Sequence, residues 1–298
     1  MVAASVVPAA SGPPGRSGSS YTQDLLTSIH SRPSEGRATD DLVVARLLLR
    51  EIRISTTSTM STSAVRLTEA EMSVGSDPAA PSFKEQSGEL EAEIRKYGPK
   101  VDNLVYAHRY TYDMKCNWKV LVDNFCECYH CAAAHRDFVD LVDMKSYRTR
   151  ARGIYSSQIS GAARSTENSA YKFKEGVVDF GYAAWYVWPN LTILCYPGET
   201  NLSALQMIPN GPENAIEHFD WFLPSTQPSP QIKDAMAYTD QTLQPEDIRL
   251  CESVQPGLKS NGFNQGRLVV DPELSELSEH AVPNFQRMVL EALGVDPR

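Results

Sequence analysis

The segment Asn117–His135 (NWKVLVDNFCECYHCAAAH) contains the side chains of this chain that are best suited to metal chemistry. His130 and His135 lie five residues apart, and Glu127 precedes the first histidine by three residues. Residues i and i+3 of a helix share one face, so Glu127 and His130 can project together. A spacing of five brings both imidazoles to one ion only if the helix is distorted or interrupted, as is frequent at functional sites.

Two kinds of metal site are compatible with these residue types. Two imidazoles and one carboxylate that leave coordination positions open suit a non-haem Fe(II) ion that activates dioxygen. The alternative is a thiolate zinc site, with ligands drawn from Cys126, Cys128, Cys131 and the two histidines, but structural zinc sites usually pair two ligand clusters separated by a loop. We therefore expect Cys126 and Cys128 to be free thiols that pack as small apolar side chains. An incidental histidine pair without any metal is the third possibility.

The composition indicates a globular protein and excludes several classes. The chain has 298 residues, 42% of them hydrophobic, which is enough for one or two domains with a buried core. Thirty-seven acidic and 28 basic residues give a formal net charge of −9, which argues against a nucleic-acid partner. Six cysteines are too few for a disulfide scaffold and favour a reducing compartment, so we expect a cytoplasmic protein.

Residues 1–76 are expected to form a low-complexity, largely disordered arm. Met1–Ser20 is rich in Pro, Gly, Ser and Ala, and Ser55–Ser63 is a second low-complexity run, so both bury too little apolar surface to offset chain entropy. Leu42–Ile54 contains three arginines; it is too short and too charged for a membrane span and predicts a short amphipathic helix. The acid-free start makes mitochondrial import the alternative location.

Residues 77–298 are expected to form one α+β domain. Leu104–Cys116 alternates and is rich in aromatic residues, which predicts a strand, and Trp118–Val142 has apolar residues at helical spacing. The order of helix, antiparallel sheet and long helices predicts a sheet with helices on one face. The further strands are expected at 147–159, 171–182, 184–196, 202–208 and 215–223, and the long helices at 230–258 and 275–293.

Asn117–His135 resembles the mononuclear-iron motif of the Rieske-type non-haem iron oxygenases. The family pattern Asn-Trp-Lys, acid-Asn-Phe and acid-x-Tyr-His-x4-His is matched here, and the form Glu-Cys-Tyr-His-Cys is typical of the branch that oxidises choline, carnitine and glycine betaine. The resemblance extends from about Asp77 to Leu293. It implies a helix-grip catalytic domain, in which long C-terminal helices cover an antiparallel sheet, and iron held by His130 and His135.

The resemblance implies roles for further residues. The family's third iron ligand is an aspartate on a C-terminal helix; Asp247 occupies that position, and Glu246 and Glu252 are the neighbouring alternatives. Glu127 is implied to relay electrons from the Rieske centre of a neighbouring subunit, and Asn124 is a catalytic residue of the same motif. Aromatic faces are expected to bind the substrate cation, although aromatic residues on strands also pack in cores. The candidates are Tyr182 and Phe219, and above all Trp185, Tyr186, Trp188, Tyr196 and Trp221.

The expected function is that of a choline-monooxygenase-like oxygenase. Iron would activate O2, with electrons from a Rieske centre, for attack on a carbon beside the quaternary nitrogen, and choline would become betaine aldehyde in glycine betaine synthesis. Carnitine and glycine betaine are the alternative substrates. The resemblance further implies a ferredoxin or reductase as electron donor and a homotrimer, without a membrane partner.

The ligands of a Rieske [2Fe-2S] cluster are not found in this sequence. Such a cluster needs Cys-x-His and, further along, Cys-x-x-His, but the first 115 residues contain no cysteine. Cys128-Tyr129-His130, the one Cys-x-His, lies inside the iron motif. The chain is therefore expected to hold no cluster of its own. A catalytically silent subunit for binding or oligomerisation is the alternative from a different class.

Overall fold

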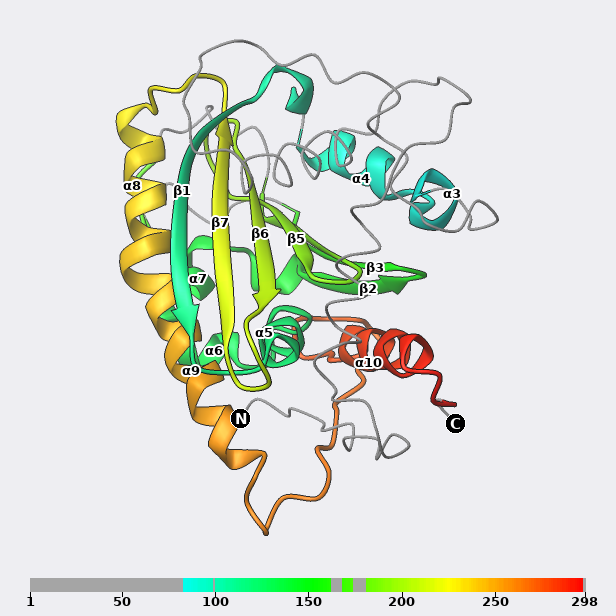
Figure 1. Cartoon of the computed structure of the whole chain (residues 1–298). Coiled ribbons are helices and arrows are strands. Elements are labelled where there is room, and N and C mark those ends of the chain that lie inside the picture. Colours follow the sequence, from blue (N-terminus) through cyan, green and yellow to red (C-terminus); the bar gives the residue numbers. More distant parts are fainter. Residues whose placement is uncertain (1–82, 99, 162–167, 174–180, 297–298) are drawn as a thin grey trace, which may run out of the picture. The chain divides into compact units, whose positions relative to one another are not determined.

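The computed structural model describes residues 83–98, 100–161, 168–173 and 181–296 (Figure 1). The arm expected at 1–76, with its amphipathic helix, and the domain boundary at residue 77 lie outside the described residues. The chain forms two compact units. One unit includes Phe83–Glu91, and the other includes the residues from Ala92 onward. The first contains α3 (Phe83–Ser87) and the start of α4 (Leu90–Tyr97), and the second contains the site.

Within the described residues, seven antiparallel strands form one sheet, in the order β1-β7-β6-β5-β4-β3-β2. The strands β2 to β7 follow one another as neighbours, and β1 pairs with β7 and forms one edge of the sheet. This mixed α+β architecture is the expected one, while the helix-grip assignment stays a prediction. The strands are β1 (Val105–Met114), β2 (Arg148–Arg152), β3 (Tyr155–Ile159), β4 (Ala183–Val187), β5 (Leu191–Cys195), β6 (Leu202–Pro209) and β7 (Ala215–Leu223).

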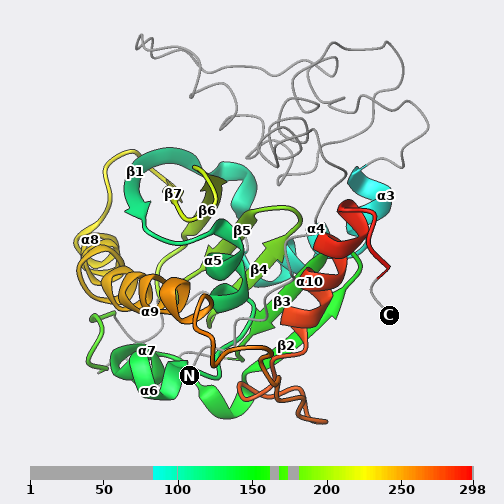
Figure 2. The ribbon, with the colours of Figure 1, turned by 60° about the horizontal axis from the view of Figure 1, so that its bottom comes forward.

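Helices cover one face of this sheet, as Figure 2 shows, and share a buried apolar core with it. The Ser-Pro pair before α8 acts as predicted, because the Ser229 hydroxyl accepts a hydrogen bond from the amide of Ile232 at 3.2 Å and caps the helix. No described helix is both long and apolar enough to cross a bilayer. The helices are α5 (Trp118–Phe125), α6 (Cys131–Ala134), α7 (Arg136–Leu141), α8 (Pro230–Tyr238), α9 (Gln244–Gly257) and α10 (Ala281–Ala292), with 3₁₀ turns at Val101–Asn103 and Met144–Ser146 and a π-helical turn at Thr239–Leu243.

The alternation of side chains along each strand decides which of them face these helices. On β4, Tyr186 belongs to the core shared with the helices, whereas its neighbour Trp185 is directed to the opposite face, where its Nε1 donates to Glu93 at 3.2 Å. On β7, Phe219 and Trp221 belong to the helix-covered core. Glu217, two residues before Phe219, lies on the same side of the strand.

Three strand predictions were wrong in detail. The stretch 147–159 is a hairpin that turns at Gly153, whose φ of 54° suits glycine. The stretch 184–196 is also two strands, since β4 ends and β5 begins around a turn at 188–190. The strand expected at 171–182 does not form in its described residues, and 174–180 lie outside them.

The last helix begins at Ala281 and not at Ser275 as the apolar pattern predicted. The carboxylate of Asp271 accepts hydrogen bonds from the amides of Glu273 and Ser275. Such local bonds between a side chain and the backbone compete with helix formation, which explains the later start.

Candidate metal centre

The helix expected over Trp118–Val142 is broken into three pieces, and the breaks position the two histidines. α5 ends at Phe125, and a turn leads to His130, which directly precedes α6. His135 has φ −119° and ψ 66°, so it separates α6 from α7. This is the interruption that the five-residue spacing requires, and it turns both imidazoles toward the same point.

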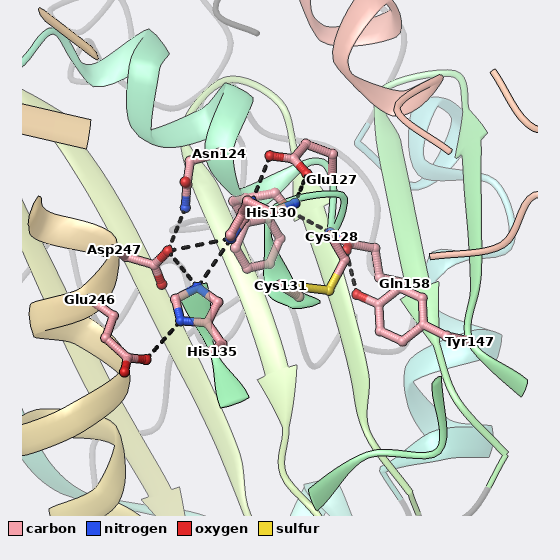
Figure 3. A network of polar contacts seen from close by, with 11 residues as sticks. Asn124, Glu127, Cys128, His130, Cys131, His135, Tyr147, Gln158, Glu246 and Asp247 are labelled. Carbon is pink, nitrogen blue, oxygen red and sulfur yellow. Dashed lines mark hydrogen bonds and ion pairs between the residues drawn. A yellow bond between two sulfur atoms is a disulfide. The ribbon is translucent and has the colours of Figure 1, made fainter. Parts of the chain in front are cut away.

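The imidazoles converge with Asp247 of α9 (Figure 3). His130 Nε2 lies 3.1 Å from His135 Nε2, and Asp247 Oδ1 lies 3.0 Å from His135 Nε2 and 3.6 Å from His130 Nε2. Two ligand atoms that bind one metal ion at about 2.1 Å and at right angles are about 3.0 Å apart. Two of the three separations match this value and the third is wider, so the three atoms could bind one metal ion, and no other group of this kind converges within the described ranges.

Two further carboxylates hold the histidines from behind. Glu127 Oε1 lies 2.7 Å from His130 Nδ1, and Glu246 Oε2 lies 2.9 Å from His135 Nδ1. These contacts favour the tautomer in which each Nδ1–H donates to its carboxylate, so both Nε2 atoms present lone pairs. Three acceptors then face one another, which requires a positive charge between them. Two imidazoles and one carboxylate with open positions are a donor set that fits ferrous iron.

The same geometry favours a proton on the imidazoles. Burial opposes protonation of His130, but hydrogen bonds with Asp247 and Glu127 outweigh it and raise its pKa to about 10. The pKa of His135 is raised in the same way, with burial outweighed first by the hydrogen bond to Asp247. Burial opposes ionisation of Asp247, yet its hydrogen bonds with the two histidines hold its pKa below the usual range.

Asn124 on α5 orients the carboxylate between the imidazoles. Its Nδ2 donates to Asp247 Oδ1 at 2.8 Å, while its buried Oδ1 has no hydrogen-bond partner among the described residues. Of the three acids that the sequence offered as third ligand, the structure places Asp247 between the imidazoles. Glu246 supports His135, and Glu252 accepts a hydrogen bond from the amide of Lys115 at 3.0 Å.

Residues 101–294 match the model of the family "Ring hydroxylating alpha subunit (catalytic domain)". The chain belongs to this family. The Rieske-type resemblance carried by Asn117–His135 is thereby confirmed.

The relatives of this catalytic domain include carnitine and choline monooxygenases. The carnitine monooxygenase oxygenase subunit of Escherichia coli (strain K12) is 33% identical over 217 residues, which are 72% of this chain and 57% of the relative. The chloroplastic choline monooxygenase of Arabidopsis thaliana is 34% identical over 175 residues, which are 55% of this chain and 38% of the relative. The structure of a quaternary ammonium Rieske monooxygenase in complex with L-carnitine has a TM-score of 0.62 and 27% identity, over 72% of this chain and 56% of that chain.

The chain spans little more than half the length of the carnitine-oxidising relatives that it matches. The carnitine enzyme also covers more of this chain than the choline enzyme does. The expectation that choline is the first substrate is therefore less well supported than its alternative, carnitine.

A cavity opens beside the candidate ligands of this catalytic domain. It contains about 680 Å³ of space not filled by protein atoms, part of it open to solvent. Both candidate ligand histidines, Asp247, Asn124 and Glu127 lie in its wall. The wall is otherwise rich in aromatic side chains: Phe125, Phe138, Tyr147, Tyr182, Tyr196 and Phe219.

The aromatic cage expected from the sequence is mostly not in this wall. Of the five favoured residues only Tyr196 lines the cavity, together with Tyr182 and Phe219 from the wider set. Trp185 cannot line it, because it is directed to the other face of the sheet. Trp221 lies behind the wall, stacked on Tyr196 and Phe219 with ring centroids 5.7 Å from each.

The other two candidates of that set pack against α10. The ring centroids of Tyr186 and Trp188 lie 5.5 and 6.2 Å from that of Phe285. Neither belongs to the described wall of the cavity. The substrate roles of Trp185, Tyr186, Trp188 and Trp221 consequently find no support in their positions.

The interpretation of Cys128 as a free thiol was wrong. Cys128 and Cys131 form a disulfide that flanks His130, and both sulfurs are thus unavailable to a thiolate zinc site. Cys126 is free and buried, as expected. Its pKa is raised by burial, which keeps it a thiol. The zinc alternative therefore loses two of its three thiolate ligands.

Sequence reasoning missed Glu217, which lies in the cavity wall with Gln244. The sequence pattern of Ala215–Leu223 (AIEHFDWFL) could have revealed it, because Glu217, Phe219 and Trp221 are alternate residues and lie on the same face of a strand. An acid on the apolar face of a strand predicts a buried carboxylate with a specific role.

Proposed function

We propose that this chain is the catalytic part of an iron-dependent monooxygenase that hydroxylates a small quaternary ammonium compound, with carnitine as the first candidate. The convergence of His130 Nε2, His135 Nε2 and Asp247 Oδ1 within 3.6 Å of one another carries this proposal. Ferrous iron bound there would supply the activation of dioxygen. Glu127 and Asn124 would hold the ligands in place.

The choice of carnitine is supported by the relatives and by the cavity. The carnitine enzymes match 63–72% of this chain at 32–34% identity. Tyr182, Tyr196 and Phe219 present aromatic rings to the cavity, and such faces attract a quaternary ammonium ion.

Choline is the second candidate, and one observation favours it. The described part of the cavity wall contains no Lys or Arg. The carboxylate of carnitine would thus depend on neutral hydrogen-bond donors, whereas choline carries only a hydroxyl group.

The proposal extends to the electron supply. Because the sequence lacks Cys-x-His and Cys-x-x-His pairs outside the iron motif, a Rieske [2Fe-2S] centre would come from outside these residues, fed by a ferredoxin or reductase. Glu127 would relay the electrons to the iron across a subunit boundary in a homotrimer. One of its carboxylate oxygens contacts His130 Nδ1 and the other accepts a hydrogen bond from the His130 amide at 3.2 Å, so it is coupled directly to the candidate ligand. The cytoplasmic location remains a prediction.

The test uses the purified full chain loaded with Fe(II). Hydrogen peroxide supplies both the oxygen atom and the two electrons, so R–H and H2O2 yield R–OH and water without a Rieske centre. We expect one iron per chain and mass-spectrometric detection of an oxygenated product from carnitine, with choline and glycine betaine as the comparison. Asp247→Ala should lose both the iron and the product.

Two outcomes would reject the proposal. Iron binding without binding or oxidation of any of the three compounds would reject the substrate class. Failure of the wild-type chain to bind iron, with carnitine still bound, would favour the silent binding subunit.

A further inference from the structure

We propose that Glu217 is the counter-charge that recognises the cationic nitrogen of the substrate. This inference rests on the proposed function and identifies the residue that selects the substrate class. Glu217 lies in the wall of the cavity, on the same strand face as Phe219, yet it is not one of the candidate ligands or of the residues that hold them.

Glu217 is a buried carboxylate without a cation beside it. Only 4% of its surface is exposed, and in the described part of the chain its one hydrogen-bond partner is Gln244, whose Nε2 donates to Oε2 at 2.7 Å. No ion pair joins it to a described Lys, Arg or His. By contrast Asp220, on the other face of the same strand, is paired with Arg109 at 2.6 Å.

The other cavity acids are already paired. Glu127 contacts His130, and Asp247 contacts both histidines. Glu217 is therefore the one acid of the described wall with no protein cation beside it. Burial raises the pKa of Glu217 to about 8, partly offset by the hydrogen bond from Gln244 and reinforced by the charge of Asp247. A cation bound beside this carboxyl group would favour its ionised form, so that substrate binding and ionisation of Glu217 support each other.

A quaternary ammonium ion would supply the positive charge that is missing beside Glu217 in the described cavity wall. It carries a permanent positive charge but has no hydrogen to donate, so it can be recognised only by electrostatic attraction and by aromatic faces. The rings of Tyr196 and Phe219 line the same cavity as Glu217. A carboxylate flanked by aromatic rings attracts such a cation and gives no comparable advantage to a neutral molecule of the same shape.

The size of the effect follows from Coulomb attraction. With methyl groups between the charges, the nitrogen and the carboxylate would lie about 5 Å apart, and at an effective dielectric constant of ~20 their attraction corresponds to an affinity gain on the order of 100-fold. Gln244 is expected to hold the carboxylate in place but not to supply charge.

The test compares two probes in the iron-loaded full chain. Choline and 3,3-dimethylbutan-1-ol have nearly the same shape, but only choline is charged. Calorimetry above pH 8, where Glu217 is ionised before the cation binds, should show that the wild-type chain prefers choline and that Glu217→Gln weakens choline binding about 100-fold while leaving the neutral alcohol unchanged. Glu217→Asp, which keeps the charge, should retain part of the preference.

Glu213→Gln is the matched control, because Glu213 is 47% exposed and pairs with Lys259 outside the cavity. It should bind both probes as the wild-type chain does. Equal weakening of both probes in Glu217→Gln, or unchanged choline binding, would overturn the role of Glu217 and leave the proposed function standing. A wild-type chain that binds neither choline nor carnitine would overturn both.

Discussion

The two carboxylates behind the histidines allow two roles of Glu127 to be separated. Glu127 contacts His130 Nδ1 at 2.7 Å, and Glu246 contacts His135 Nδ1 at 2.9 Å. Glu127→Gln and Glu246→Gln each keep an oxygen that can accept the Nδ1 proton but remove the negative charge. If both acids only position a ligand, the two variants should both lose iron affinity and should differ only in the size of that loss.

The expected losses of iron affinity follow from these contacts. A hydrogen bond to a charged group contributes about 1.5–3 kcal/mol and a neutral one about 0.5–1.5 kcal/mol, so losing the charge costs ~1–1.5 kcal/mol, or roughly tenfold in affinity. Outer partners of metal ligands generally contribute about 10- to 100-fold. The Glu127 side chain is 3% exposed and that of Glu246 is 23% exposed. We therefore expect a loss of about tenfold for Glu246→Gln and one closer to 100-fold for Glu127→Gln.

The assay measures iron affinity by competition with a chelator and then turnover at saturating iron. Turnover is driven once by a Rieske-containing electron donor and once by hydrogen peroxide, which needs no relay. If Glu127 relays electrons, Glu127→Gln should lose donor-driven turnover and keep most of its peroxide-driven turnover, while Glu246→Gln should keep both. Donor-driven turnover of Glu127→Gln at the level of Glu246→Gln would refute the relay. Unchanged iron affinity in both variants would refute the positioning argument.

Three further predictions concern the metal, the disulfide and the buried acid. Iron at 100 times its dissociation constant should stabilise the wild-type chain by about 2.7 kcal/mol and leave Asp247→Ala unchanged, which thermal unfolding with and without Fe(II) would test. Replacing Cys128 and Cys131 together by alanine should lower the free energy of unfolding by ~2 kcal/mol, since the disulfide closes a short loop; in urea titrations dithiothreitol should destabilise the wild-type chain only, and equal sensitivity of both proteins would contradict this. The folded-state pKa of Glu217 is about 8 and the ordinary pKa of a glutamate is 4.5, so between these values the unfolded state releases a proton that the folded state keeps. The wild-type stability should fall with rising pH across this window by up to ~1.4 kcal/mol per pH unit relative to Glu217→Gln, and parallel pH curves would argue against it.

The segment around the histidines could be predicted because its chemistry is local. The three-residue spacing of Glu127 and His130 predicted that the two side chains project together, and the structure shows them in contact at 2.7 Å. The predicted reason, a shared helix face, was wrong, because both residues lie in the turn between α5 and α6. The five-residue spacing to His135 required an interrupted helix, and the structure has that interruption. The choice among three nearby acids could not be made from spacing alone and came from the family resemblance. In the structure, α9 places Asp247 beside the Nε2 atoms of both histidines.

The substrate cavity could not be predicted because it depends on strand phase. Trp185 and Tyr186 are neighbours in the sequence, so a strand directs them to opposite faces. They cannot both line one cavity, and this constraint alone rejects a cage that uses the two together. Which face is covered by helices is decided by tertiary packing, and therefore Tyr182 and Phe219 could not be ranked above Trp221 in advance.

The position of Asp247 depends on the register of α9 along the segment that carries the histidines. The amide of Lys115 donates to Glu252 at 3.0 Å, that of Asn117 donates to Gln255 Oε1 at 2.8 Å, and Asn124 Nδ2 reaches Asp247 at 2.8 Å. These three contacts follow the helix over more than two turns. A shift of one residue would move α9 by ~1.5 Å along its axis and turn it by about 100°, which would carry Asp247 away from both Nε2 atoms. Asn117 lies far from the histidines in the sequence motif. Its amide nevertheless contributes to the centre, because its hydrogen bond to Gln255 fixes the axial position of α9 and thereby that of Asp247.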